Sequence, residues 1–209
     1  MLYRGSLNIR LTFGYDESMV IPREPLIRGH RRDYTQTPRV TKAYIIGILH
    51  DATQRKTTYR VSQKSEKFVK FVQNGIKDLG GNAWIYKEGN NRNVYIVEFS
   101  KSFLKDVKIE SEKEKTDYIR GYFDTDGAVA KNDKTRYYIY FCQKNFNDLS
   151  NVRNYLINQG IDCGVIHNPS RNVDPFYWRF FIKAKSYNDF AEKVGSWHPE
   201  KSKFLRMKR

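Results

Sequence analysis

Apolar and polar positions follow the same order of patterns twice along this chain. Residues 42–52 have helical character and contain Tyr-x-x-Gly, two apolar residues and then an acid, and the same series returns over residues 117–127. Each run is followed by alternation at period two, over 57–63 and over 136–142, which predicts a half-buried strand. The chain therefore reads as two similar halves.

Each half continues with a second helix and two more strands. In the first half, apolar residues at helical spacing follow Ser65, a candidate N-cap, and stop at Gly80-Gly81, before predicted strands over 83–87 and 94–99. In the second half we predict a helix over 147–158, strands over 162–166 and 176–183, and a helix over 187–194. The recurrence after roughly 75 to 80 residues indicates a duplication.

This order of helix, strand, helix, strand, strand and helix predicts an α+β fold. Helices on one face of an antiparallel sheet leave the other face open, and that face is suited to a ligand as large as a duplex. Among the alternating strand positions, those expected to face the core are Tyr59, Val61, Ile139 and Phe141. The open face receives Thr58, Arg60 and Ser62 in one half and Arg136, Tyr138 and Tyr140 in the other. We expect a basic arm (1–40), a first repeat with its linker (41–114) and a second repeat with a C-terminal tail (115–209).

The ends of the two motif runs are chemically unusual. Glycine inside a helix costs about 1 kcal/mol relative to alanine, so Gly47 and Gly121 at matched positions indicate two closely packed backbones. Asp51 and Asp126 follow at the negative pole of each helix dipole, where a carboxylate is unfavourable and a bound cation reverses the sign. The pattern predicts two helices that cross at the glycines and bring the two acids side by side.

These two runs resemble the paired LAGLIDADG motifs of homing endonucleases in their single-chain form. Each motif is followed by a strand that ends in Gln-Lys, at Gln63-Lys64 and at Gln143-Lys144, as in the compact archaeal enzymes encoded in ribosomal RNA introns. The resemblance covers roughly residues 42 to 198. It implies two pseudo-symmetric αββαββα-like repeats whose antiparallel sheets form a DNA-binding saddle, with the motif helices at the interface.

The resemblance also implies a site and its chemistry. Asp51 and Asp126 would be the catalytic metal ligands for Mg²⁺, which takes oxygen donors and keeps phosphate and water in its shell. Lys64 and Lys144 would supply positive charge at the scissile phosphates, and Gln63 and Gln143 would orient water. One position departs from the family pattern: five residues after Gly47 stands Ala52, with the acid one place earlier. We expect the first helix to end in a different turn.

The basic composition of the chain indicates a polyanionic partner. The 38 Lys and Arg against 23 Asp and Glu give a formal charge of +15, and the default partner for such a chain is nucleic acid. No apolar run is long enough to span a bilayer and no signal peptide is visible, so we expect an intracellular protein without a membrane partner. Candidate DNA contacts on or beside the strands are Arg55, Lys56, Thr58, Arg60, Ser62, Lys131, Arg136, Tyr138, Tyr140, Arg171, Arg179 and Lys183.

The leading interpretation is a monomeric, Mg²⁺-dependent endonuclease that cuts a long non-palindromic site in double-stranded DNA and spreads its intron. Different side chains on the two open faces imply different bases in the two half-sites. Two alternatives stay open. One is an RNA-binding maturase that acts on intron RNA, and the other is a DNA-binding protein without catalysis, for which the shifted Asp51 is the main argument.

Overall fold

The computed structural model describes residues 39–89, 92–132 and 134–206, so most of the expected basic arm lies outside the described residues. The first half runs in the order α1 (Lys42–Ile48), a 3-10 turn (Leu49–Asp51), β1 (Ala52–Gln54), β2 (Thr58–Gln63), α2 (Glu66–Asp78), β3 (Ala83–Lys87), β4 (Tyr95–Ser100) and a 3-10 turn (Lys101–Leu104).

The second half follows a similar order with one strand fewer and adds two helices. It contains α3 (Glu112–Asp126), β5 (Gly127–Val129), β6 (Ile139–Gln143), α4 (Phe146–Asn158), β7 (Trp178–Phe181), a 3-10 turn (Ala184–Ser186), α5 (Tyr187–Lys193) and α6 (Lys201–Arg206). No helix within the described ranges has the length and apolar character needed to cross a membrane.

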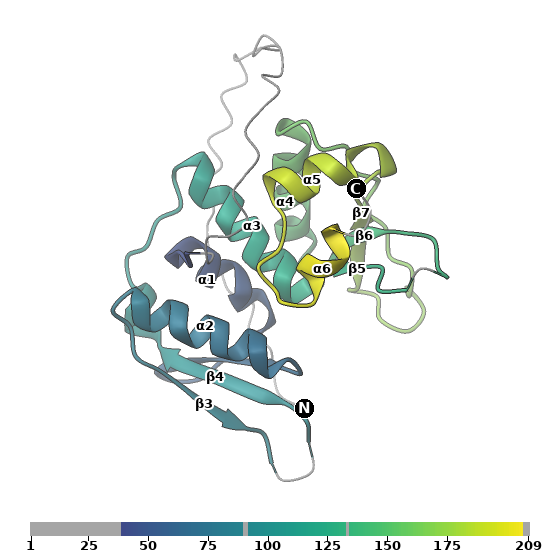
Figure 1. Ribbon diagram of the computed structural model, residues 1–209. Coiled ribbons are helices and arrows are strands. Elements are labelled where there is room, and N and C mark those ends of the chain that lie inside the picture. Colours follow the sequence, from purple (N-terminus) through teal and green to yellow (C-terminus); the bar gives the residue numbers. More distant parts are fainter. Residues whose placement is uncertain (1–38, 90–91, 133, 207–209) are drawn as a thin grey trace.

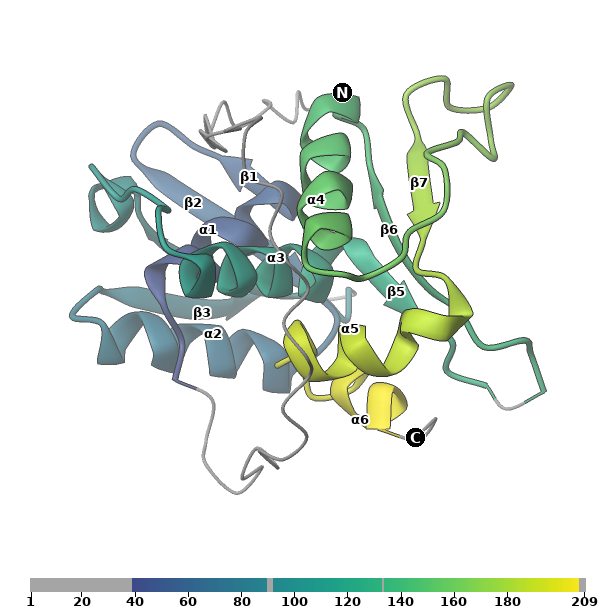
Figure 2. The same ribbon diagram turned by 90° about the horizontal axis from the view of Figure 1, so that it is seen from above.

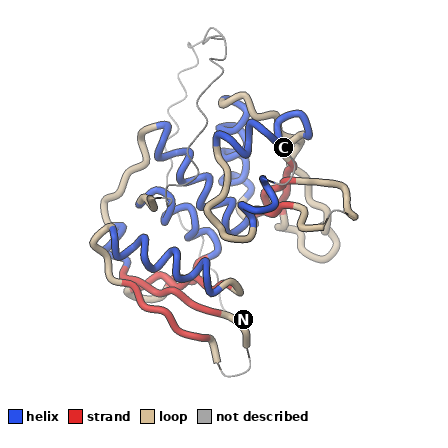
Figure 3. The backbone as a smooth tube through the Cα atoms, in the orientation of Figure 1, coloured by secondary structure: helices blue, strands red, loops and turns tan. Residues whose placement is uncertain are grey.

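The strands form two separate antiparallel sheets. The first has the order β1-β2-β4-β3 and the second the order β5-β6-β7. Figures 1 and 2 show the sheets in different halves of the molecule, with α1 and α3 crossing between them, and Figure 3 separates the strands from the helices. The predicted α+β class with two pseudo-symmetric repeats and the motif helices at their interface is confirmed.

Each half has its own apolar core. In the first half Phe68 and Val72 of α2 pack with Val61 and Phe99 of the sheet, and all four are fully buried. In the second half the fully buried Phe141 lies with its ring centroid 5.2 Å from those of both Phe123 and Phe180. Full burial of such a side chain stabilises a fold by about 1.5–3 kcal/mol.

Caps fix where the helices begin and end. The predicted N-cap Ser65 accepts a hydrogen bond from the backbone N–H of Phe68 at 3.3 Å, and Gly80 follows α2 with φ of 79°, as a C-terminal glycine does. The second motif helix begins earlier than the motif itself. Ser111 and Glu114 form a capping box there, with each side chain bonded to the backbone N–H of the other residue.

The strands differ from the sequence prediction at several points, and β7 is shorter than the strand predicted over 176–183. The three-residue strands β1 and β5 were not predicted from the alternation, because three residues are too few to show a period. The strand predicted over 136–142 begins only at Ile139, so Arg136 lies before it. The strand predicted over 162–166 is reduced to isolated bridges at Cys163–Ile182 and His167–Arg179, whose registers differ by one residue, as at a β-bulge.

Candidate functional site

The two motif helices touch through their glycines. A Cβ added to Gly47 would lie 2.0 Å from the carbonyl oxygen of Tyr118, and one added to Gly121 would lie 2.2 Å from the carbonyl oxygen of Tyr44. Both tyrosines stand three residues before the glycine of their own motif, so the contact is two-fold related. Any side chain at either glycine would therefore collide with the opposite backbone, which explains why glycine stands inside both helices.

The first acid occupies the same place in its half as the second acid does in the other. Ala52 pairs with Val61 in the first sheet, and Gly127 pairs with Phe141 in the second, in each case two residues before the glutamine of Gln-Lys. The residue before each paired position is an aspartate. Asp51 and Asp126 are thus equivalent by strand register, although they differ by one in distance from the motif glycine.

A 3-10 turn absorbs the missing residue. From Gly121 to Asp126 the chain takes five α-helical steps of about 1.5 Å, which is about 7.5 Å. From Gly47 to Asp51 it takes one such step and then three steps through the turn Leu49–Asp51 at about 2.0 Å each, again about 7.5 Å. The expectation that the first helix ends in a different turn is confirmed.

Each aspartate is held by the glutamine of its own half. The side-chain amide of Gln63 donates to Oδ2 of Asp51 at 3.0 Å, and that of Gln143 donates to Oδ2 of Asp126 at 3.1 Å. All four side chains are half-buried. This matched pair of contacts fixes the orientation of both carboxylates before any cation or DNA is present.

The two lysines of the Gln-Lys pairs differ in their surroundings. Lys64 lines a cleft beside Asp51. Lys144 is exposed, and its ammonium donates to Asp174 at 3.0 Å, a contact that lowers the pKa of the Asp174 carboxyl. The first half therefore presents its lysine to the cleft, while the second half keeps its lysine in an ion pair.

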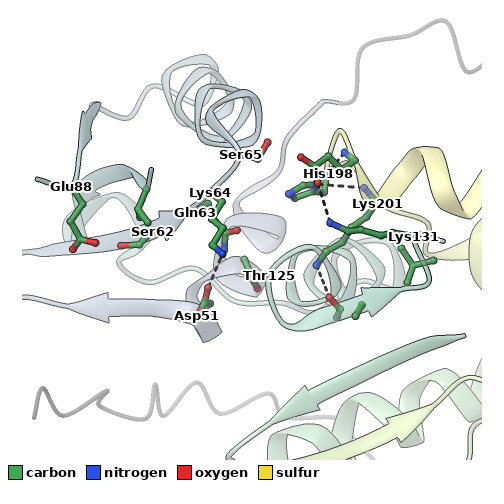
Figure 4. A pocket seen from close by; sticks show the side chains of 15 residues that line it. Asp51, Ser62, Gln63, Lys64, Ser65, Glu88, Thr125, Lys131, His198 and Lys201 are labelled. Atoms are coloured by element: carbon green, nitrogen blue, oxygen red, sulfur yellow. Dashed lines mark hydrogen bonds and ion pairs between the residues drawn. The ribbon is translucent and has the colours of Figure 1, made fainter. Parts of the chain in front are cut away.

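A cleft of about 780 Å³ lies between the end of α1, the end of α3 and the C-terminal segment. Figure 4 shows Asp51 and Gln63 on one wall, Thr125 between them and the opposite wall, and His198, Lys201 and Lys131 on that wall. The cleft also touches Gly127, so it meets both neighbours of Asp126 in the chain. The segments at the ends of both motif helices thus line one cleft.

Lys201 of α6 closes the end of the second motif helix. Its ammonium donates to the backbone carbonyls of Phe123, Asp124 and Gly127 at 2.8, 2.8 and 2.6 Å. Burial lowers its pKa to about 8, against the opposing effect of the Asp124 and Asp126 carboxylates. The last carbonyls of a helix have no intrahelical partner, and a cation there also offsets the dipole. Sequence analysis missed this residue, because its acceptors are backbone atoms far away along the chain.

Asp124 has a different setting from the two acids at the helix ends. It is 1% exposed, and it accepts hydrogen bonds from the Tyr44 hydroxyl at 2.7 Å, from the Trp197 backbone N–H at 3.0 Å and from the Ser196 hydroxyl. Burial raises the pKa of its carboxyl, and Lys201 and these hydrogen bonds oppose that shift. Asp124 therefore joins the two motif helices to the C-terminal segment.

The two carboxylates at the helix ends carry oxygen donors, which suit a hard divalent cation and would fill only part of its coordination shell. The described residues contain no group of three or more His, Cys, Asp or Glu arranged to enclose a metal. Two carboxylates from two chain segments are what Mg²⁺ commonly takes from a protein, with phosphate and water completing its shell. Asp51 and Asp126 therefore supply oxygen donors of the kind that such a cation takes from a protein.

The candidate DNA contacts fall into three groups. Thr58, Arg60 and Ser62 lie on β2 with Val61 buried between them, and Tyr138 and Tyr140 alternate with the buried Ile139 and Phe141, as the parity predicted. Arg179 lies on β7. The remaining candidates are exposed residues in turns and loops next to the strands, at Arg55, Lys56, Lys131, Arg136, Arg171 and Lys183.

Comparison with known proteins identifies the fold. Residues 113–195 match the family model described as a LAGLIDADG-like domain, and no curated protein matches the chain. The structure of I-DmoI in complex with DNA and Mn is 22% identical, with a TM-score of 0.54 over 74% of this chain and 95% of that chain. The complex of I-DmoI with DNA and Ca is 20% identical, with a TM-score of 0.59 over 79% and 96% of the two chains.

A further similar structure is the N-terminal LAGLIDADG domain of DUF199/WhiA. It is 16% identical, with a TM-score of 0.59 over 76% of this chain and 84% of that chain. Another I-DmoI structure is named as a homing endonuclease, while this domain carries a different name on the same fold. This chain thus has the LAGLIDADG fold, and the fold alone does not decide whether it cuts DNA.

Proposed function

We propose that this chain, with its LAGLIDADG fold, is a site-specific endonuclease that cuts double-stranded DNA with a divalent cation, Mg²⁺ in the cell. The observation that carries the proposal is the matched pair of helix ends. Asp51 and Asp126 occupy equivalent register positions, and each accepts a hydrogen bond from the glutamine of its half. Asp51 and both chain neighbours of Asp126 line one cleft. A fold that only binds DNA has no need for two oriented carboxylates at unfavourable helix ends.

Each side chain has a distinct task in phosphodiester hydrolysis. Asp51 and Asp126 would hold the cation, whose charge stabilises the phosphate oxygens and lowers the pKa of a bound water. Gln63 and Gln143 keep the carboxylates oriented and would position the attacking water. Lys64 stands at the cleft, where its charge offsets that of the phosphate, and Lys144 reaches a phosphate once it leaves Asp174. Each half would cut one strand.

The remaining features of the proposal follow from the two unlike halves. A monomer whose open faces carry different side chains would read a long non-palindromic site. The formal charge of +15 supports a partner rich in phosphate and an intracellular place of action. By its resemblance to intron-encoded enzymes, the biological role would be the spread of an intron into intronless copies of its host gene.

Cleavage of an intronless copy of the host gene tests the proposal. The purified protein is incubated with that duplex in Mg²⁺ or in EDTA, beside the double variant Asp51→Asn/Asp126→Asn. We expect a double-strand break with Mg²⁺ and wild-type protein alone. Tight duplex binding without a break would favour the alternative of a DNA-binding protein without catalysis. Splicing of the intron RNA without any break would favour a maturase.

A further inference from the structure

The open faces of the two sheets differ in their chemistry. On the first sheet the guanidinium of Arg60 donates to Glu88 at 2.7 Å. Beside it the buried carboxylate of Glu98 accepts hydrogen bonds from the hydroxyls of Thr58 and Tyr86, both at 2.6 Å. This face thus pairs several of its donors with its own carboxylates, although the buried Nε of Arg60 has no hydrogen-bond partner among the described residues. A ligand that approaches Arg60 has to compete with a carboxylate.

The second sheet presents rings in place of acids. We use the name aromatic face for Tyr138, Tyr140, Tyr177 and Phe181 together with Arg179. The ring centroids of Tyr138 and Tyr140 lie 5.6 Å apart, and those of Tyr140 and Phe181 lie 5.5 Å apart. The members of this face are half-buried, and none of them is acidic.

Arg179 stands at the centre of the aromatic face. Its guanidinium carbon lies 4.4 Å from the ring centroid of Tyr140, 5.4 Å from that of Tyr177 and 5.7 Å from that of Phe181. One terminal nitrogen donates to the Tyr177 hydroxyl at 3.3 Å, and the buried Nε has no hydrogen-bond partner among the described residues. The rings hold the guanidinium, and no carboxylate among the described residues is bonded to it.

This arrangement prepares an arginine for planar recognition. The guanidinium carries five N–H donors in a rigid fork that matches two acceptors side by side, and aromatic stacking limits the rotamers that binding would otherwise have to freeze. In the major groove, guanine offers such a pair of acceptors at O6 and N7, and thymine offers a methyl group for apolar contact. The aromatic face supplies both kinds of partner.

Given the proposed binding of duplex DNA, we propose that Arg179 reads a guanine in the second half-site and that the surrounding rings contact thymine methyl groups next to it. Base preference is then sharper in this half-site than in the one read by the first sheet, because Arg60 is engaged by Glu88. Arg179 is in this sense the main specificity-determining residue of the chain.

Selection of binding sites from a pool of randomised DNA duplexes tests the inference, because such a pool does not require the natural target sequence. Wild type, Arg179→Lys and Arg60→Lys are compared, with unfolding midpoints measured to confirm that each variant folds. We expect Arg179→Lys to lose the preference for guanine at one position by about 10- to 100-fold, the range of one bidentate pair. Arg60→Lys should change its consensus less.

A second measurement addresses the rings. Replacing the thymidine beside that guanine by deoxyuridine removes only the methyl group. This replacement should weaken binding by wild type several-fold and should weaken binding by Phe181→Leu less. An unchanged consensus for Arg179→Lys would overturn the inference while duplex binding stands. Tighter binding of single strands than of the matching duplex would assign the rings to base stacking instead. No enrichment of any duplex by wild type would overturn the proposed function as well.

Discussion

Tyr44 donates its hydroxyl hydrogen to Asp124 across the interface of the motif helices, at 2.7 Å. The matched tyrosine of the second helix, Tyr118, bonds through its hydroxyl to Nε2 of His50. Each tyrosine precedes its motif glycine by three residues, and each partner follows the other glycine by three. The helices are thus joined by two equivalent hydrogen bonds with different partners, one a carboxylate and the other an imidazole whose pKa burial lowers to about 4.

The glycine contact gives a first prediction. Gly121→Ala would place a Cβ 2.2 Å from the carbonyl oxygen of Tyr44, and backbone cannot move aside as the end of a side chain can. We expect the free energy of unfolding to fall by at least about 3 kcal/mol, at the upper end for overpacking. Chemical denaturation measures this loss. Gly164→Ala is the control, because its Cβ would meet Phe181 at an ordinary 3.4 Å and should cost little.

The second prediction concerns the carboxylates. Asp126→Asn should abolish cleavage or nearly so, while binding of the duplex stays within about tenfold, because a metal ligand is lost and the DNA-reading strands are untouched. Asp51→Asn should behave alike, given its equivalent register and its hydrogen bond from Gln63. Strand-labelled duplexes measure both steps. Full Mg²⁺-dependent activity in either variant would remove that residue from the site.

A third prediction tests the register at the first helix end. Moving the acid to the position that a residue count from Gly47 suggests, by Asp51→Ala with Ala52→Asp, should not restore activity. Ala52 is 6% exposed and pairs with Val61 inside the sheet, so a carboxylate there would be buried. Cleavage and unfolding assays on the double variant should both show a loss. Activity close to wild type would mean that the count from Gly47, and not the strand register, gives the functional position of the acid.

Lys201 gives a fourth prediction. Lys201→Met keeps the aliphatic stem but removes the ammonium from three backbone carbonyls, of which that of Phe123 keeps the N–H of Gly127. We expect a loss of about 2 kcal/mol in stability. The end of α3 should loosen, and cleavage of the strand served by Asp126 should slow more than that of the other strand. Lys203→Met, an exposed neighbour on α6, is the matched control. Equal slowing of both strands would limit Lys201 to a general structural role.

A fifth prediction concerns acid. Burial lowers the pKa of His198 to about 4, from an ordinary 6.5. Between pH 4 and pH 6.5 the His198 imidazole is therefore protonated in the unfolded chain and neutral in the folded chain. Its contribution to stability is full above pH 6.5 and falls by about 3 kcal/mol toward pH 4. Nδ1 of His198 accepts from the backbone N–H of Glu200, which an asparagine oxygen can replace. His198→Asn should therefore lose less stability between pH 7 and pH 4.5 than wild type.

The sequence predicted those features best whose residues recur at matched positions in the two motifs. The glycines predicted the crossing of α1 and α3, because a helical glycine without a packing reason is a cost, and strand β3 has the predicted bounds. The acids were found from the repeated pattern and their place at the negative pole of each helix dipole, and the glutamines through the resemblance to paired motifs. The strand register then added what a residue count could not, that Asp51 and Asp126 are equivalent.

Other parts of the site depend on contacts that leave no local pattern. Lys201 bonds to backbone carbonyls, which every residue carries, so its sequence neighbourhood shows only a basic C-terminal stretch. The ion pair between Lys144 and Asp174 joins a strand end to a loop, and the rings around Arg179 meet only once β6 and β7 pair. Tertiary structure alone brings these groups together.

The 3-10 turn at Leu49–Asp51 bears on how two copies of a duplicated unit can drift apart. Loss of one residue from an α-helix ordinarily rotates all that follows by about 100°, a period of 3.6 residues per turn, and would turn a catalytic group away from its partner. Here the half with one residue fewer has a stretched last turn, and the strand after it has the matching pairing. The two halves thus have the same length along the helix axis from motif glycine to aspartate, and four residues span it in one half and five in the other.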